Sequence, residues 1–378
     1  MKKSLLALAV LSAVAGAASA QTSVVIFGNI GGSVRHIEDA PTGSTKNSMA
    51  NASNYQTNSF GFRGVEDLGS GMNAHFVLDT TFVSGTGSQA LPTSLFDRQA
   101  LVGVTTQYGT IDLGRVFGPQ FYAAISYDPF DTHYTGVDPI TRNSISASQA
   151  SDNTASSNSR TDNAINYTNK FGDLTVRAEY AFGEQANSAN NGSTKAVGAV
   201  YQTPTMTLGA AYTKKKLRAD YSTPLYGNDA YTPAQAATGA GFKDADYYTA
   251  GGSYTFGPLR ASVGYAHEDR KTNAADHVER NLWTGLRYNL MPTVQLVGGY
   301  FKTNISSNAG SSRKDMFVVS AAYLLSKRTT LFVEMDHANF HGPQLPIDAL
   351  GQFAPSVPPT ASFSQLKNGT MIGMNHNF

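Results

Sequence analysis

Three aspartates lie on one long stretch of the chain that shows few other signs of regular structure. The stretch follows an extended segment at residues 108–115 and reaches about residue 159, and its first half carries Asp128, Asp131 and Asp138. The same half is rich in rings, which are Phe117, Phe121, Tyr122, Tyr127, Phe130 and Tyr134. Loops longer than about a dozen residues are usually functional or disordered. We expect this half to fold into the protein and narrow an internal passage, with a mobile surface loop as the alternative.

Five arginines could supply the opposite charge on a wall that faces this loop. Four fall on the polar side of extended segments and the last stands where such a segment turns into the loop; they are Arg35, Arg63, Arg98, Arg160 and Arg115. Carboxylates on one side and guanidinium groups on the other would place a transverse electric field across a narrow passage. Such a field favours ions and small polar solutes over apolar ones. A structural ion pair, such as Arg63 with Glu66, is the alternative for each arginine.

The segments that must hold these residues show a side-chain period of two. Residues 174, 176, 178, 180 and 182 are apolar, whereas residues 173, 175, 177 and 179 are polar or charged. The alternation recurs near residues 24–35, 206–213 and 259–268, and no apolar period of 3.6 persists for more than two turns. This pattern predicts strands with one apolar and one polar face. It is weaker over residues 316–325, where a register shift of one residue would exchange the two faces.

The connections alternate in length along the whole chain. Seven short turns are interleaved with eight longer polar loops, so fifteen connections predict about sixteen strands. Short turns at one rim, long loops at the other and an even strand number are typical of a transmembrane antiparallel β-barrel, in which closure gives every backbone group a partner. The last segment, ending at Phe378, is expected to close the barrel against the segment that starts at about Ser23. A soluble sandwich is the alternative, although its strands are usually shorter.

The N-terminus and the composition both indicate export. Lys2 and Lys3 precede an apolar run, and an A-S-A sequence at residues 18–20 fits a cleavage site, so residues 1–20 are interpreted as a signal peptide and 21–378 as one barrel domain. The chain contains no cysteine, which excludes disulfides and thiolate metal sites. Without the two lysines of the signal peptide, 26 of the 28 basic residues remain against 27 acidic ones. With no polybasic segment, no nucleic-acid partner is expected.

Several sequence motifs follow one another in a specific order and spacing. The strongest are G-F-R-G-V-E-D-L-G-S-G at residues 61–71, F-D-R-Q-A-L-V-G-V at 96–104, Y-G-T-I-D-L-G-R at 108–115 and D-P-F at 128–130. Weaker ones are A-Y-L-L-S-K-R-T at 322–329 and the terminal Phe378. Together they cover essentially the whole mature chain, which resembles the Gram-negative general porins of the neisserial and β-proteobacterial type.

The resemblance implies an all-β, sixteen-stranded outer-membrane barrel with its third long loop folded into the lumen. It also implies a homotrimer in outer-membrane lipid, through which ions and small hydrophilic solutes diffuse in a water-filled channel. Phe378 would match the aromatic terminus that barrel-assembly machinery reads in this family. Relatives often carry arginine at the lumen positions of Asn166, Asn375 and Asn377, so we expect weak ion selectivity of either sign. A channel specific for a sugar or an anion, with the loop rings as a sliding track for a sugar, is the main alternative.

Catalytic and metal chemistry find little support in the residue pattern. An outer-membrane hydrolase would need a serine, a histidine and an orienting group together, but the eight histidines are scattered and no Gly-x-Ser-x-Gly motif occurs. His337 and His341 have the spacing of a metal-binding pair on a helix, but this segment has the pattern of a strand. We therefore expect no enzyme, no metal and no cofactor, with the hydrolase as a remote alternative.

Overall fold

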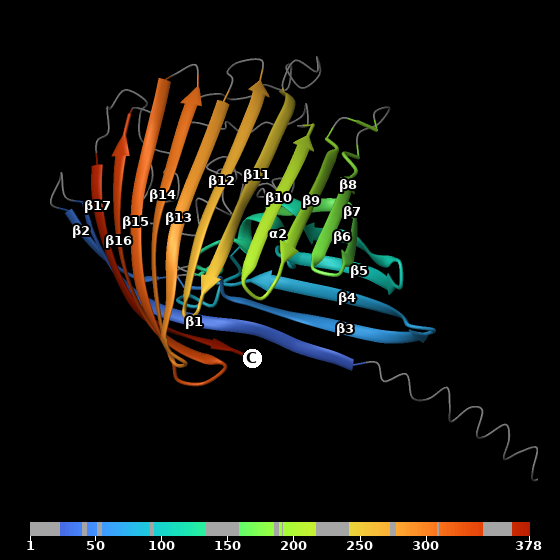
Figure 1. Cartoon of the computed structure of the whole chain (residues 1–378), viewed down its shortest axis with the longest axis horizontal. Coiled ribbons are helices and arrows are strands. Elements are labelled where there is room, and N and C mark those ends of the chain that lie inside the picture. Colours follow the sequence, from blue (N-terminus) through green and yellow to red (C-terminus); the bar gives the residue numbers. More distant parts are fainter. Residues whose placement is uncertain are drawn as a thin grey trace, which may run out of the picture.

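The computed structural model describes residues 23–39, 44–50, 55–90, 94–133, 159–184, 189–190, 192–216, 242–272, 277–307, 310–342 and 365–378. These residues form one closed antiparallel β-sheet, and a short helix lies inside it (Figure 1). Within this part of the chain, no helix has the length and apolar character needed to cross a bilayer. The expected signal peptide, residues 1–20, lies outside the described residues and stays a prediction.

Seventeen strands make up the sheet, and paired strands are antiparallel. The first nine are β1 (Ser23–Asp39), β2 (Ser44–Ala50), β3 (Ser59–Gly69), β4 (Met72–Thr81), β5 (Gln99–Thr106), β6 (Gly109–Phe117), β7 (Arg160–Phe171), β8 (Leu174–Ala181) and β9 (Thr194–Gln202). The others are β10 (Met206–Lys215), β11 (Phe242–Phe256), β12 (Leu259–Thr272), β13 (His277–Met291), β14 (Val294–Ser307), β15 (Gly310–Leu324), β16 (Thr329–His341) and β17 (Gln365–Asn377). From β3 onward consecutive strands pair, and β17 returns to pair with β1, Asn377 opposite Asn29. The predicted barrel and its predicted closing strand are confirmed.

The strands β2 and β3 share one edge of β1. β1 pairs with β3 through residues 23–29 and with β2 through residues 33–39. The two strands therefore occupy a single position in the barrel, and the seventeen strands fill sixteen positions. This confirms the prediction of about sixteen strands.

The gap between β2 and β3 is filled by one side chain. Asn58 Oδ1 accepts a hydrogen bond from the N–H of Gly31 at 2.6 Å, and Asn58 Nδ2 donates to the carbonyl of Gly31 at 3.2 Å. Asn58 is 1% exposed, so no water replaces these contacts. The amide side chain thus takes the place of the missing strand residue opposite Gly31 in β1.

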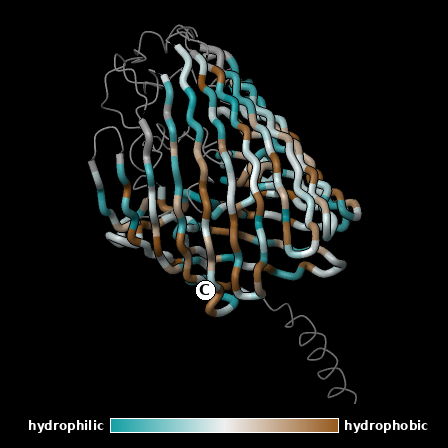
Figure 2. The backbone as a smooth tube through the Cα atoms, turned by 60° about the vertical axis from the view of Figure 1, so that its left-hand side comes forward, coloured by the Kyte–Doolittle hydropathy of each residue, from teal (hydrophilic) through white to brown (hydrophobic). Residues whose placement is uncertain are grey.

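Side chains alternate between the lumen and the outer surface, as the sequence predicts. On β15, Met316, Val318 and Ser320 are buried on the inner side, whereas Phe317 and Val319 are both 55% exposed on the outer side. This fixes the faces of the weakly alternating segment. Figure 2 shows hydrophobic and hydrophilic stretches alternating along neighbouring strands. An outer surface of apolar side chains suits contact with lipid.

Short turns join pairs of strands at one rim, as predicted from the connection lengths. β7 and β8 are joined at Gly172, with φ +60°, and β11 and β12 are joined at Gly257, with φ +57°. Glycine adopts positive φ without a steric penalty, which explains its place in these tight hairpins. Antiparallel pairing places the longer connections at the opposite rim.

The third long connection enters the barrel. It begins after β6 with α2 (Pro119–Ser126), whose first residue is proline, a residue favoured at this position because its ring presets the helical φ. α2 lies against β9, β10 and β11 on the inner side (Figure 1). The expected inward loop is confirmed for residues 117–133, whereas residues 134–158 lie outside the described part. The sequence does not predict the helix itself, because eight residues are too few to show a helical period.

Replacing Asn58 with alanine is expected to destabilise the barrel. The change leaves a buried N–H group and a buried carbonyl of Gly31 unpaired, and each such group costs about 1–3 kcal/mol. We expect a lower urea midpoint for loss of the folded band in electrophoresis of unheated samples. Asn73→Ala on β4, which removes a half-buried asparagine from the same wall, is the matched control. Equal midpoints for the two variants would contradict this account.

Candidate functional site

The start of the inward loop is held by two arginines over one aromatic ring. The guanidinium carbon of Arg98 lies 5.7 Å from the centroid of the Phe117 ring, and that of Arg160 lies 4.9 Å from it. Phe117 in turn stacks on Phe121 of α2, with 4.3 Å between the centroids. Each cation–π contact stabilises the arrangement by about 0.5–2 kcal/mol. Two of the five candidate arginines therefore meet where the chain leaves β6.

The middle of the loop lies on the inner face of β11–β14. Tyr127 is fully buried, its ring stacks on Trp283 with 5.7 Å between centroids, and its hydroxyl lies 2.6 Å from Thr249 Oγ1. Phe130 is also buried, and its ring centroid lies 5.7 Å from that of Phe301. Burial of such large rings fixes the loop against the wall through the hydrophobic effect. Rings that are buried in this way are not exposed to a passing sugar.

Two arginines of the wall bind the loop. Arg260 on β12 donates to the carbonyl of Ser126 at 2.7 Å and to Asp131 Oδ1 at 3.1 Å. Arg287 on β13 donates twice to the carbonyl of Pro129, at 3.1 and 2.6 Å, and also forms an ion pair with Asp131. Asp131 therefore contacts two guanidinium groups.

The sequence alone did not connect these two arginines with the loop. Alternation places Arg260 on the lumen side, and Arg287 lies directly opposite it on the neighbouring strand. Because both side chains fall on the lumen side of neighbouring strands, the alternation pattern could have predicted that they lie next to each other. The path of the loop across the wall, which alternation does not encode, decides that they bind it.

Asp128 has a structural role inside the loop. Its side chain is fully buried, and its two carboxylate oxygens accept backbone hydrogen bonds from Phe130 at 2.9 Å and from Thr132 at 2.6 Å. Burial raises the pKa of Asp128 to about 6, although both backbone hydrogen bonds oppose the shift. The structure therefore places Asp128 away from the open lumen, unlike the expectation. Asp138 lies outside the described residues.

The end of the described loop meets the segment that precedes β3. The ring of Tyr55 stacks on His133 with 4.5 Å between centroids and 10° between planes. It also stacks on Phe332 of β16, again with 4.5 Å between centroids. Gln56, next to Tyr55, accepts a hydrogen bond from Asn375 Nδ2 at 3.2 Å. Burial lowers the pKa of His133 to about 4. The segment at residues 55–58 and the loop therefore hold each other through aromatic contacts.

The wall opposite the loop is formed by β3–β6, given their positions in the closed sheet. Arg63 on β3 is exposed, and its guanidinium carbon lies 5.2 Å from the centroid of Phe27. His75 on β4 and Asp112 on β6 meet across Gly103 of β5, with 2.7 Å between Nε2 and Oδ1. A Cβ at Gly103 would lie 2.3 Å from the Asp112 carboxylate, so glycine permits this contact.

The remaining candidate arginines contact carboxylates. Arg98 also donates to Asp79 at 2.7 Å, and Arg115 forms an ion pair with Asp162 and donates to the carbonyl of Asp97 at 2.7 Å. These arginines keep partial exposure, between 16% and 19% for the side chains. They therefore combine a structural ion pair with contact to the lumen.

Arg35 lies in a buried cluster. Its guanidinium group binds Asp336 at 2.6 Å and Glu334 at 3.4 Å, and its side chain is only 3% exposed. The structure thus favours the structural ion pair over the expected pore-lining role for this arginine. A buried guanidinium group with two carboxylates needs close hydrogen-bonded geometry, because desolvation of each ion costs several kcal/mol.

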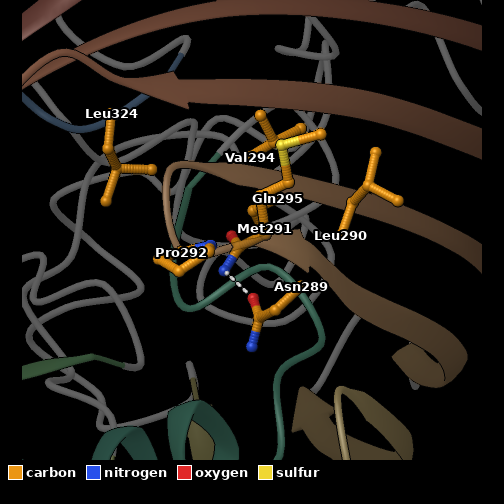
Figure 3. A pocket seen from close by; sticks show the side chains of 7 residues that line it. All are labelled: Asn289, Leu290, Met291, Pro292, Val294, Gln295 and Leu324. Atoms are coloured by element: carbon orange, nitrogen blue, oxygen red, sulfur yellow. Dashed lines mark hydrogen bonds between the residues drawn. The ribbon is translucent and has the colours of Figure 1, made fainter.

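A hollow at the rim with the short turns lies apart from the inward loop and the arginines described above. It encloses about 490 Å³ and is lined by Asn289, Leu290, Met291, Pro292, Val294, Gln295 and Leu324 (Figure 3). Gln295 donates to Asn289 Oδ1 at 3.1 Å within it, as the dashed line shows. None of these lining residues is ionisable. The hollow therefore contributes no charge that could select ions.

Comparisons with known proteins agree with this barrel. Residues 7–342 match the family model described as Gram-negative porin. The chain belongs to this porin family.

Two similar proteins illustrate the relation. The porin is 28% identical over 391 residues to outer membrane porin protein 32 of Delftia acidovorans, with all of both chains covered. Its fold matches a solved anion-selective porin from Comamonas acidovorans with a TM-score of 0.74 and 21% identity, covering 95% of this chain and 100% of that one. It also matches a trimer form of OmpT, an outer membrane protein of Vibrio cholerae, with a TM-score of 0.64 and 13% identity, covering 94% and 99%.

The porin is a passive channel of the outer membrane. Its sixteen barrel positions enclose a lumen that the inward loop narrows, and small hydrophilic solutes and ions diffuse through the remaining opening. Family membership indicates a channel rather than an enzyme.

Two buried groups of the loop are expected to respond to acid in opposite ways. The pKa of Asp128 is raised from 3.8 to about 6, so its protonation stabilises the seated loop, and this stabilisation is lost as the pH rises through 6. The pKa of His133 is lowered from 6.5 to about 4, so the seated loop loses stability as the pH falls from 6.5 towards 4. Asp131 and Arg287 act on both groups, the first raising and the second lowering each pKa.

Asp128→Asn should therefore make the loop more sensitive to acid. The variant keeps one acceptor oxygen but can no longer take up a proton at residue 128. The stabilisation that protonated Asp128 gives at low pH is therefore lost, whereas the destabilisation by protonated His133 remains. Single-channel recordings between pH 7.5 and 4.5 should show brief closures that become more frequent towards low pH than in the wild type. His133→Phe, which keeps a ring on Tyr55, should show the reverse trend. If the Asp128→Asn variant keeps the wild-type pH profile, this explanation is wrong.

Proposed function

We propose that this porin is a general diffusion channel whose constriction lies between loop residues 117–133 and the wall of β3–β6. The observation that carries the proposal is the burial of Tyr127 and Phe130 on the inner face of β11–β14, which holds loop residues 117–133 to one side of the lumen. The same burial favours general diffusion over a sugar-specific channel, because these rings offer no exposed track. We further propose that the protein has no catalytic role.

The expected site residues divide into two groups under this proposal. Five of them border the opening, namely Arg63, Arg98, Arg115, Arg160 and Asp131. Two support it from buried positions, Arg35 within the wall and Asp128 within the loop. Asp138 lies outside the described residues and stays a prediction.

The charge balance at this opening supports a weak preference for anions. Arg63 lies over Phe27, at 5.2 Å from the ring centroid, and a ring does not neutralise a cation as a carboxylate does. Asp131 shares its single charge with two arginines. A relative of the same fold is described as anion-selective, which agrees with this preference. The ion pairs of Arg98 and Arg115 keep the preference weak.

Arg63→Gln should reduce the preference for anions. The reversal potential across a potassium chloride gradient gives the ratio of anion to cation permeability. Loss of one exposed positive charge at the opening should lower that ratio about twofold, because charges within one Debye length of about 8–10 Å still act on passing ions. Arg328→Gln, in the exposed turn between β15 and β16, is the control and should leave the ratio unchanged. An unchanged ratio in the Arg63→Gln variant, or a wild type that prefers cations, would refute the assignment.

A homotrimer is supported by an interruption in the outer aromatic surface. Aromatic residues project outward towards the long-loop rim on much of the barrel, and they are Tyr180, Tyr212, Tyr248, Tyr265, Tyr300 and Phe317. The described outward residues within β16, β17, β1 and β2 include no phenylalanine, tyrosine or tryptophan. A row of aliphatic residues crosses these strands instead: Val333, Ile372, Val34 and Met49. Aromatic girdles belong to lipid-facing surfaces, so their absence supports contact with another subunit here.

Ile372→Glu should separate the subunits. Ile372 is 63% exposed at the centre of the aliphatic row, and a carboxylate at a buried subunit contact would be left unpaired. Native mass spectrometry in detergent should give three chains for the wild type and one for the variant. Leu286→Glu on β13 is the control and should remain trimeric. Leu286 also faces outward and is 54% exposed, but it lies on the part of the barrel that carries the outward aromatic residues. A monomeric wild type, or an identical response of both variants, would count against this interface.

A further inference from the structure

One glycine faces the lumen on each of six consecutive strands beneath the loop. These residues are Gly198 on β9, Gly209 on β10, Gly251 on β11, Gly264 on β12, Gly285 on β13 and Gly299 on β14. Three neighbouring pairs are in direct register, Gly209 with Gly251, Gly251 with Gly264, and Gly285 with Gly299. We call this row the glycine track. At each of these positions the wall itself contributes no side chain to the lumen.

The loop follows the glycine track in the order of the chain. A Cβ at Gly198 would lie 3.0 Å from Pro119 Cβ, and one at Gly209 would lie 2.9 Å from Tyr127 Cε1. A Cβ at Gly251 would lie 2.5 Å from Tyr127 Cδ2.

The next two contacts continue along β13 and β14. A Cβ at Gly285 would lie 2.6 Å from Pro129 Cβ, and one at Gly299 would lie 2.6 Å from Phe130 Cε2. The sixth glycine, Gly264, lies under the indole of Trp283, on which Tyr127 stacks. From Pro119 to Phe130 the loop thus rests on the backbone of the wall at five of the six glycines, and on the Trp283 indole at the sixth.

The shortest separations show that three positions of the glycine track have no room for a side chain. Carbon atoms in contact normally lie about 3.5–4.0 Å apart, so a methyl group at Gly251, Gly285 or Gly299 would overlap the loop by about 1 Å. The backbone of the barrel is fixed by hydrogen bonds on both sides of each strand, whereas the loop borders the open lumen. At Gly299, where the nearest atoms belong to the side chains of Phe130 and Phe301, a methyl group would therefore displace the loop into the lumen. At Gly251 and Gly285 it would in addition press on carbonyl oxygens of the wall, those of Val263 at 2.5 Å and Gly298 at 2.8 Å.

We propose that the glycine track sets the width of the channel by allowing the loop to lie one side-chain layer closer to the wall. The size limit for solutes is then determined by residues that no solute touches. This inference rests on the proposed diffusion channel with its constriction at the loop. It adds that side-chain volume between the loop and the wall of β9–β14 determines which solutes pass, and not only charge at the opening.

Gly299→Ala and Gly285→Ala test the proposal. Each places a methyl group against Phe130 or Pro129, so the loop should shift by about 1 Å and the single-channel conductance should fall by on the order of a quarter to a half. In liposome-swelling assays with sugars of increasing size, the same variants should exclude sugars that the wild type admits. Ion selectivity should change little, because no charge is altered.

Gly298→Ala is the matched control. Gly298 is adjacent to Gly299 on β14 but faces outward, and its nearest neighbour would be Val319 Cγ1 at 3.7 Å from the added Cβ. It introduces the same residue into the same strand and should leave conductance and size limit unchanged. If the track variants conduct like Gly298→Ala, or conduct more than the wild type, the proposal is refuted. A wild type that does not conduct at all would refute the channel function instead.

A second pair of variants covers the possibility that the tightest replacements prevent folding. Gly198→Ala needs a shift of only a few tenths of an ångström, because its Cβ would lie 3.0 Å from Pro119. It should fold and give a smaller decrease in conductance than the replacements at Gly285 and Gly299. Phe130→Leu combined with Gly299→Ala removes ring volume where the methyl group is added and should restore much of the lost conductance. A double variant no better than Gly299→Ala, or Gly198→Ala with wild-type conductance, would contradict the proposal.

Discussion

Every backbone hydrogen bond of a barrel within lipid must be made inside the sheet, and the rest of this structure depends on that constraint. Closure of β17 on β1 satisfies it around the ring. Asn58 satisfies it at Gly31, where β2 and β3 leave a gap. The outer surface must then be apolar, because side chains alternate and one face meets lipid. Polar and charged groups are consequently confined to the lumen and to the loop that enters it.

The loop is held by two kinds of contact that act together. Its rings bury apolar area on bare backbone and on Trp283, while Arg260 and Arg287 bind carbonyl groups that would otherwise lie unpaired near the wall. Most charges near the opening also have a partner: Arg98 has Asp79, and Arg115 has Asp162. Paired charges give a wet passage with a modest field, which suits passage of many small solutes.

The sequence predicted the barrel, its strand number, the closing strand and the inward loop, because each follows from side-chain period, turn length or motif order. It failed where a role depends on the path of the chain through space. Asp128 accepts hydrogen bonds from two backbone N–H groups. The sequence alone does not distinguish this structural role from that of a carboxylate lining the pore. The same holds for Arg35, whose partners lie some three hundred residues away. Lumen glycines on successive strands are visible in the sequence, but their common level requires the strand register.

The chain contains one tryptophan, and its position gives the protein a property of its own. Trp283 is fully buried and stacks on Tyr127, so its indole lies between the wall and the loop. Indole fluorescence shifts to longer wavelength when water reaches the ring. The chain also has 19 tyrosines. When the protein is excited at a wavelength that only indole absorbs, its emission therefore comes from the contact between loop and wall, and an unlabelled sample reports optically whether that contact is intact.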